Sequence, residues 1–209
     1  MRYIVDPEKI EEKSFHIVNK LLSASKFPER EKQVAARVIH TTTDLDYTKD
    51  LSFHPKAIES GLSAIRAGRD VICDVSMVMA GINTRILSYF GGRAVCFIND
   101  KSIMRQASRL RLARAILAMR KASRLMDGAI IAIGNAPTAL FEVCNLIKSK
   151  KIKPALVIGI PVGFVGAKDS KKELASLDIP YITNRSTKGG STVACAIVNA
   201  ILKMAKEGR

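Results

Sequence analysis

In the first third of the chain, hydrophobic residues recur every three to four positions, which is the spacing of one face of an α-helix. The pair Asp6-Pro7 precedes the first such stripe, and an aspartate cap followed by proline commonly begins a helix. We therefore expect a helical lead-in before any sheet. Three helices are predicted there: one after Asp6, one over residues 28–40 and one over residues 54–68.

From residue 70 onward the pattern changes to short, nearly continuous hydrophobic runs that alternate with helical patterns. Such runs are typical of parallel strands buried on both faces. We predict an α/β fold that is doubly wound, with a mostly parallel five-stranded sheet and helices on both of its faces. No repeat or linker suggests a second domain, so residues 1–209 are expected to form one domain. The predicted strands lie at residues 70–75, 94–98, 129–133, 155–160 and 180–183, and the later helices at 101–125, 137–149, 168–177 and 190–206.

The charge of the chain points to an anionic ligand. Its 34 Lys and Arg against 19 Asp and Glu give a formal charge of +15, which attracts polyanions. Nucleic acid is one such partner, but only 5% of the residues are aromatic, Trp is absent, and basic residues do not alternate with aromatic ones. The longest hydrophobic stretch, residues 155–167, is too short to cross a bilayer and contains Gly and Pro. We therefore expect neither nucleic acid nor a membrane as a partner.

The four cysteines are scattered through hydrophobic runs, with no C-x-x-C pair and no histidine at ligand spacing. Buried, reduced thiols are therefore expected, and no metal site is predicted. Reduced thiols fit a cytoplasmic protein. The cysteines are Cys73, Cys96, Cys144 and Cys195.

Three glycine-bearing loops follow predicted strands, at residues 134–140, 161–171 and 184–192. Ligands of an open parallel sheet bind at the carboxyl ends of its strands, and backbone N–H groups in such loops bind anions. Ordinary turns between strands and helices have the same composition, so both interpretations stay open for each loop. Neither G-x-G-x-x-G nor G-x-x-x-x-G-K-[ST] occurs, which disfavours the alternative of a nucleotide- or sugar-phosphate-binding enzyme.

The segment "RVIHTTTD" at residues 37–44 holds the one candidate for proton transfer, His40. An imidazole titrates near neutral pH, but a histidine at the end of a helix is often only a structural cap. No G-x-S-x-G motif is present and no cysteine neighbours a histidine, so no nucleophilic triad is predicted. From the pattern alone both roles of His40 stay open. His54 precedes a helix-starting proline, and a capping or surface role is expected for it.

Five segments then occur in order along the chain: "HTTTD" at 40–44, "ICDVSMVMAGI" at 72–82, "AIGNAPTALF" at 132–141, "IGIPVGFVGAKDSK" at 158–171 and "KGGST" at 188–192. Together they closely resemble the precorrin-8X methylmutase family, which includes the cobalt-precorrin-8 methylmutases of corrin (vitamin B12) biosynthesis. The resemblance implies an isomerase, an intramolecular transferase that moves a methyl group from carbon 11 to carbon 12 of (cobalt-)precorrin-8. The implied product is (cobalt-)cobyrinate or hydrogenobyrinate.

The resemblance also implies what the enzyme binds. The partner is a corrinoid substrate, held near the interface of a homodimer, and no added cofactor takes part. Cobalt, if present, belongs to the substrate, and the sequence leaves open whether the natural substrate contains it. The Met-rich stretch at residues 75–82 suits an interface between subunits.

Individual residues match the family's site. His40 falls on its catalytic histidine, which would place one proton as the double bonds of the macrocycle rearrange, and Ser14 falls on a substrate contact in the first helix. Thr84 and Arg105 match positions near the ligand.

The carboxylates of the substrate suit three sets of backbone N–H groups, at residues 134–138, 163–166 and 188–191, together with the ammonium of Lys188. Asn135 and Gly189 thus become candidate substrate contacts in addition to Lys188.

One position departs from the family's pattern. The family usually has glycine where Thr43 stands. If the backbone there needs a positive φ, a β-branched residue is strained, so the geometry of the turn after His40 is the point to examine.

Overall fold

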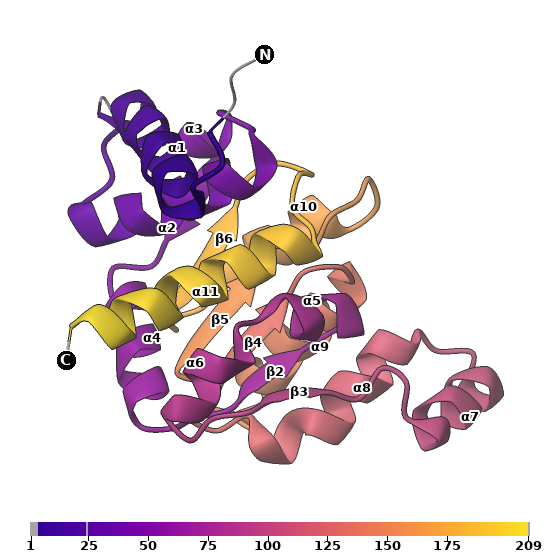
Figure 1. The fold of residues 1–209 in the computed structure, drawn as a ribbon. Helices are drawn as coiled ribbons and strands as arrows, with labels where there is room; N and C mark the ends of the chain where they lie inside the picture. Colours follow the sequence, from indigo (N-terminus) through magenta and orange to yellow (C-terminus); the bar gives the residue numbers. More distant parts are fainter. Residues whose placement is uncertain (1–3, 24, 209) are drawn as a thin grey trace.

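The computed structural model describes residues 4–23 and 25–208, which form a six-stranded sheet with helices on both faces (Figure 1). The strand order is β1-β6-β5-β4-β2-β3, with β1 antiparallel to β6 and every other neighbouring pair parallel. The doubly wound, mostly parallel α/β fold predicted from the sequence is confirmed. The strands are β1 (Leu51–Phe53), β2 (Val71–Cys73), β3 (Ala94–Cys96), β4 (Ile130–Ile133), β5 (Leu156–Gly159) and β6 (Tyr181–Asn184).

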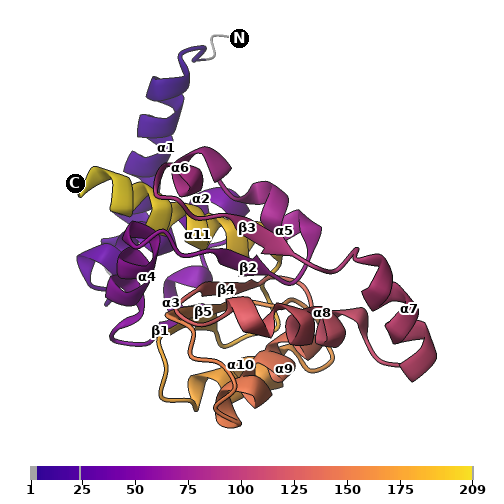
Figure 2. The ribbon, with the colours of Figure 1, turned by 90° about the horizontal axis from the view of Figure 1, so that it is seen from below.

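One face of the sheet is covered by the N-terminal helices and by the last helix (Figures 1 and 2). The predicted helical start is confirmed, since the carboxylate of Asp6 accepts the N–H of Glu8 at 3.0 Å and Pro7 begins the helix. The long helix α11 packs on α2 and buries Ile197 and Ile201 against the sheet. The helices of this layer are α1 (Pro7–Leu22), α2 (Glu29–Thr42), α3 (Tyr47–Asp50), α4 (Ala57–Arg66), α5 (Ser76–Gly81), α6 (Thr84–Tyr89) and α11 (Ser191–Glu207).

The opposite face is covered by the helices that follow β3, β4 and β5, whose core includes Met119, Leu140 and Leu174. Helix α7 projects from this layer and packs on α8 through Ile103, Ala107 and Leu117, a cluster separate from the main core. The helices of this side are α7 (Lys101–Leu110), α8 (Arg114–Ala122), α9 (Pro137–Lys148) and α10 (Ala167–Ala175), with a 3-10 turn at Ser123–Leu125.

The fold differs from the prediction in several elements. The short helices α3, α5 and α6 were not predicted. The sheet has a sixth strand, β1, which is only three residues long and pairs with β6 at the sheet edge. The single helix predicted over residues 101–125 is wrong, because Arg111 adopts a left-handed conformation with φ 51° and separates α7 from α8.

Candidate functional site

His40 lies exposed in the last turn of α2, where its imidazole stacks on the ring of Phe15 from α1. The ring centroids are 4.8 Å apart and the ring planes are inclined by 14°. The guanidinium of Arg37, one turn earlier on α2, lies 4.6 Å from the centre of the same Phe15 ring and pairs with Glu11 at 3.2 Å. One face of the imidazole is therefore covered by an aromatic ring that is itself held by α2.

His40 does not cap its helix. Helix α2 is capped by Thr43, whose N–H donates to the carbonyl of Ile39 at 2.7 Å. The imidazole of His40 takes no part in that cap and instead stacks on Phe15. His54 differs, because its Nδ1 accepts the N–H of Lys56 at 3.1 Å in the turn before α4, although the N-cap of α4 is Lys56. The structure thus removes the capping explanation for His40.

The backbone at Thr43 is left-handed, with φ 54° and ψ 24°, so the positive φ considered from the sequence is present. This conformation costs an ordinary residue about 1–2 kcal/mol relative to the right-handed one. The hydroxyl of Thr42 donates to the carbonyl of Val38 at 2.9 Å and accepts the N–H of Asp44 at 3.2 Å. The turn therefore leads the chain sharply from His40 to Asp44.

A groove of about 300 Å³ opens beside the Phe15–His40 pair, between α2, the start of α6, and α11. Arg37 and Lys203 contribute its cations, and the ammonium of Lys203 lies 5.8 Å from the Phe15 ring. Its neutral polar groups come from Thr41, Asn83, Thr192 and Asn199. Such a lining suits a ligand with carboxylates and hydrogen-bonding groups at its rim.

Two of the predicted substrate contacts are close to this region in the chain, but neither is among the residues that line the groove. Ser14 is the neighbour of Phe15 on α1, which packs on the His40 helix α2, and its hydroxyl donates to the carbonyl of Ile10 at 2.8 Å. Thr84 is the exposed first residue of α6, beside Asn83 of the groove lining. The roles of Ser14 and Thr84 as substrate contacts stay predictions.

Arg105 is not brought to the same place. It is an exposed residue of α7, which projects on the side of the molecule away from α1 in both views (Figures 1 and 2). Within one chain, Arg105 and His40 therefore belong to opposite ends of the molecule.

The loop that follows β4 is already occupied by an internal anion. The carboxylate of buried Asp74, at the end of β2, accepts three N–H groups: Gly134 at 3.0 Å and Asn135 and Ala136 at 2.8 Å each. Burial raises the pKa of Asp74, while these three N–H groups lower it. The prediction that these N–H groups bind substrate carboxylates is therefore wrong for residues 134–136, and Pro137 has no N–H.

This place is the switch point of the sheet, because β2 and β4 are neighbours whose following helices cover opposite faces. In doubly wound folds that crevice is where ligands bind. Here Asp74 supplies the anion itself. The exposed side chain of Asn135 stays a predicted contact.

The basic loop after β6 is also largely satisfied within the chain. The N–H groups of Lys188 and Gly190 donate to the Ser186 hydroxyl at 3.1 Å and to the carbonyl of Ile160 at 3.0 Å. Gly189 has φ 152°, and a Cβ there would lie 2.5 Å from the same Ile160 carbonyl oxygen, so this position requires glycine. Its role as a substrate contact stays a prediction.

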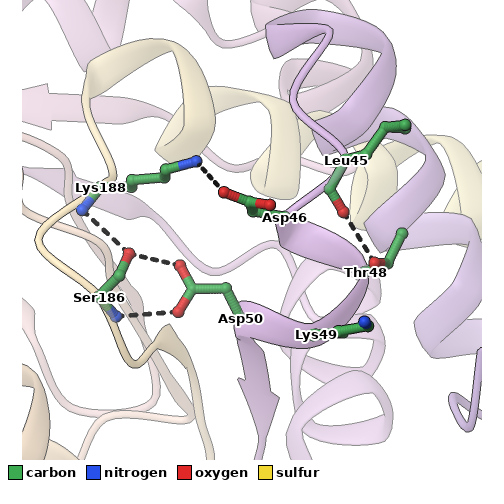
Figure 3. A pocket seen from close by; sticks show the side chains of 7 residues that line it. All are labelled: Leu45, Asp46, Thr48, Lys49, Asp50, Ser186 and Lys188. Carbon is green, nitrogen blue, oxygen red and sulfur yellow. Dashed lines mark hydrogen bonds and ion pairs between the residues drawn. The ribbon is translucent and has the colours of Figure 1, made fainter.

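The ammonium of Lys188 is held by two carboxylates at 2.6 Å each, that of Asp44 and that of Asp46, and Figure 3 shows the second of these contacts. The hydrogen bonds to both carboxylates raise the pKa of Lys188, and the bond from Lys188 lowers the pKa of Asp44. A cavity of about 510 Å³ lies beside this ion pair, between α3 and the loop. A substrate carboxylate would reach Lys188 only in competition with the two aspartates.

All four cysteines are free thiols. Cys73 and Cys144 are buried as predicted, whereas the burial predicted for Cys96 and Cys195 is wrong, since both are partly exposed. The described residues bring together no group of three or more His, Cys, Asp or Glu that could hold a metal ion. Among the described helices, none combines the length and hydrophobicity that a membrane span requires.

Sequence reasoning missed the residues that surround His40. Phe15 follows the predicted contact Ser14, and Arg37 stands three positions before His40, so on one helix it shares the histidine's side. That spacing could have identified Arg37 from the sequence. No sequence signal pointed to Lys203, because it lies far along the chain and reaches the groove through the packing of α11 on α2.

The fold and the site together define a doubly wound α/β protein with an exposed, ring-stacked histidine beside a basic groove. The chain belongs to the precorrin-8X methylmutase family, whose sequence model it matches over residues 9–204. It is therefore an enzyme of the class that moves a methyl group within one molecule.

Individual relatives agree over nearly the whole chain. The cobalt-precorrin-8 methylmutase of Priestia megaterium is 47% identical over 204 residues, which cover 98% of this chain and 91% of that protein. The precorrin-8X methylmutase of Pseudomonas aeruginosa is 37% identical, with coverage of 95% and 96%. Among solved structures, the precorrin-8x methyl mutase of Thermus thermophilus superimposes with a TM-score of 0.90 at 36% identity, covering 96% of this chain and 97% of that one.

Proposed function

We propose that this enzyme moves the methyl group of (cobalt-)precorrin-8 from carbon 11 to carbon 12, and that His40 is the group that handles the proton. The observation that carries this proposal is the state of His40. It is exposed, takes no part in the cap of its helix, and stacks on Phe15, whose ring lies beside Arg37 and Lys203 of the basic groove. An imidazole so placed is free to exchange a proton with a bound ligand.

The reaction requires the protein to hold the substrate in its reactive shape and to place one proton. The bond from the methyl carbon to carbon 11 breaks, a bond to carbon 12 forms, and the double bonds of the macrocycle shift between them. Substrate and product are isomers, so His40 ends each cycle with the proton count at which it began. The remaining contribution is to hold the macrocycle in its reactive shape, a positioning effect that is worth several orders of magnitude in rate.

The groove supplies the groups for that positioning. Arg37 and Lys203 are cations that suit the carboxylates of the substrate, and the hydroxyls of Ser14 and Thr84 suit its polar rim. We propose that no added cofactor takes part and that any cobalt arrives with the substrate. Two relatives named cobalt-precorrin-8 methylmutase, at 47% and 42% identity, favour the cobalt-containing form. The four free thiols accord with a cytoplasmic enzyme.

We propose that Arg105 contributes to the site of a second subunit. Its place on the projecting α7, away from His40, fits a homodimer in which α7 of one chain reaches the groove of the other. Helix α7 and the turn after it also expose the hydrophobic side chains of Met104, Leu110 and Leu112, which suit an interface.

The direct test is to incubate the purified protein with cobalt-precorrin-8 and, separately, with metal-free precorrin-8. We expect a product of unchanged mass with an altered visible absorption spectrum and chromatographic mobility. Heat-denatured protein serves as the control. Recovery of both substrates unchanged would contradict the proposed function, and conversion of only one would identify the natural form.

A further inference from the structure

Lys171 is a fully buried lysine that the proposed chemistry does not use. It lies on α10, its side chain is 1% exposed, and its ammonium donates to the backbone carbonyls of Ser186 at 2.9 Å and of Lys188. Burying an ammonium costs several kcal/mol, so a hydrophobic side chain of similar size would fill the space at lower cost. The two carbonyls are the reason for a cation here, because they would otherwise lose hydrogen-bond partners.

The same loop is fastened from a second side by Asp50 at the end of α3. The carboxylate of Asp50 accepts the N–H of Ser186 at 2.9 Å and the Ser186 hydroxyl at 2.6 Å (Figure 3). It also accepts the N–H of Arg185 at 2.9 Å and the side-chain amide of Asn184 at 2.8 Å. Asn184 also donates to the carbonyl of Lys188 at 2.9 Å. The backbone at Ser186 and Lys188 is therefore determined by a cation on one side and an anion on the other.

The loop so fixed determines where the Lys188 side chain goes. Its ammonium donates to Asp46 (Figure 3) and to Asp44, which both lie in the segment directly after the His40 helix. That segment begins at the left-handed Thr43, a conformation that persists only when its surroundings hold it. The contacts thus form a continuous series from α10 through the loop to the end of α2.

We propose that Lys171 is a positioning residue: by holding the backbone at Ser186 and Lys188, it places the Lys188 ammonium to fix the segment after His40 and so the end of α2. The proposal rests on the proposed role of His40 in proton transfer. It assigns Lys188 to the support of the histidine and not to the binding of a substrate carboxylate.

The main test variant is Lys171→Met, which keeps the length of the side chain and removes the ammonium. We expect the amide NMR signals and hydrogen-exchange rates of residues 43–46 to change, although these residues do not touch Lys171. We expect kcat to fall roughly tenfold or more, as for other misplaced catalytic groups, with the Kd of the coloured product changed less than about twofold. Lys148→Met is the matched control, since it removes the ion pair between Lys148 of α9 and Glu173 of α10. It should change neither the amide signals of residues 43–46 nor kcat.

A second variant keeps the proposal testable if Lys171→Met does not fold. Lys188→Met removes the last contact of the series from a side chain that is 40% exposed, so folding should survive. It should reproduce the changes at residues 43–46 and the loss of kcat. The double variant should lose no more turnover than the more affected single variant, because both act through one contact.

Three results would overturn the proposal: unchanged amide signals at residues 43–46 in both variants, turnover losses that multiply in the double variant, or a Lys188→Met variant that weakens product binding tenfold while keeping kcat. The amide signals are measured without substrate. The amide signals of residues 43–46 therefore test the link between Lys171 and this segment even if the methylmutase assignment or the role of His40 is wrong.

Discussion

The side chain of Phe15 gives the imidazole of His40 a defined place on an exposed surface. The two rings stack at 4.8 Å, and Phe15 has the Arg37 guanidinium as a further partner. An exposed histidine without such a contact would sample several rotamers, and a proton would reach the substrate from only one of them.

Phe15→Leu should therefore lower kcat while leaving the stability of the core unchanged to within about 1 kcal/mol, because the position is only half-buried. The imidazole proton signals of His40 should shift as the ring current of Phe15 is lost. Phe15→Tyr should retain the stack and most of the turnover. Phe27→Leu, which removes an aromatic contact with Phe53 outside the site, is the control. An unchanged His40 spectrum in Phe15→Leu would show that the stack does not exist in solution.

Thr43→Gly should stabilise the protein. Glycine relieves about 1–2 kcal/mol of left-handed strain and costs about 0.5–1 kcal/mol of chain entropy, which leaves a net gain on the order of 0.5–1 kcal/mol. Urea unfolding measures the difference. Thr41→Gly, inside the same helix, should instead destabilise. A loss of stability in Thr43→Gly would mean that Thr43 makes a compensating contact.

At the scale of elements, the pattern of hydrophobic residues predicted the parallel strands because each is a continuous hydrophobic run. Strands β2, β4 and β5 are buried throughout, whereas β3 at the sheet edge is only partly buried. Strand β1 was not predicted because "LSF" is three residues long and its partner β6 lies far along the chain. The break between α7 and α8 was not predicted because it occurs at Arg111, whose residue type favours helices but whose backbone is left-handed here. The same holds for the site. A local motif predicted His40 as a candidate, whereas its contact with Phe15 and the hydrogen bonds of Asp74 arise from packing between distant segments and could not be predicted from local sequence.

Asp74→Asn tests the anion at the switch point. The substitution keeps the shape but turns one acceptor oxygen into an NH2 group that faces backbone N–H donors. We expect a loss of about 1–3 kcal/mol in the free energy of unfolding, the cost of buried donors without acceptors. Asp127→Asn, whose exposed carboxylate accepts only the N–H of Lys153, should cost less. Equal losses in the two variants would contradict a special role for Asp74.

Burial of Lys171 predicts a pH dependence of stability. Its pKa is lowered by burial from 10.5 to about 8, against the opposing effect of Asp50. Between these values the unfolded chain holds a proton that the folded chain has released, so the free energy of unfolding should rise with pH in this window. The same measurement on Lys171→Met isolates this contribution, since other groups titrate alike in both proteins. A constant difference between the two proteins from pH 7 to pH 10 would contradict the lowered pKa.

At the scale of the whole molecule, the separation of α7 from His40 predicts a site that needs two chains. Light scattering should give the mass of a dimer at micromolar concentration, and the mass of a single chain would contradict the proposal.

A mixing experiment tests which chain supplies Arg105. His40→Ala and Arg105→Ala homodimers should both be impaired. A heterodimer of the two has one site with both changes and one with neither, if each site joins His40 to the partner subunit's Arg105. Its turnover should then recover to about half that of the native dimer. No recovery would place both residues in the same chain's site, and an Arg105→Ala homodimer with native turnover would remove Arg105 from the site.

The central claim is tested most directly by the single-turnover rate of His40→Ala with bound substrate. We predict that the variant melts at the native temperature, binds the coloured corrinoid with nearly native affinity, and loses about 10²–10⁴-fold in rate, the usual contribution of a general acid–base group. The control is His16→Ala, which removes an exposed histidine on α1 and should keep the native rate. A His40→Ala protein that isomerises its substrate at the native rate would contradict the proposed mechanism.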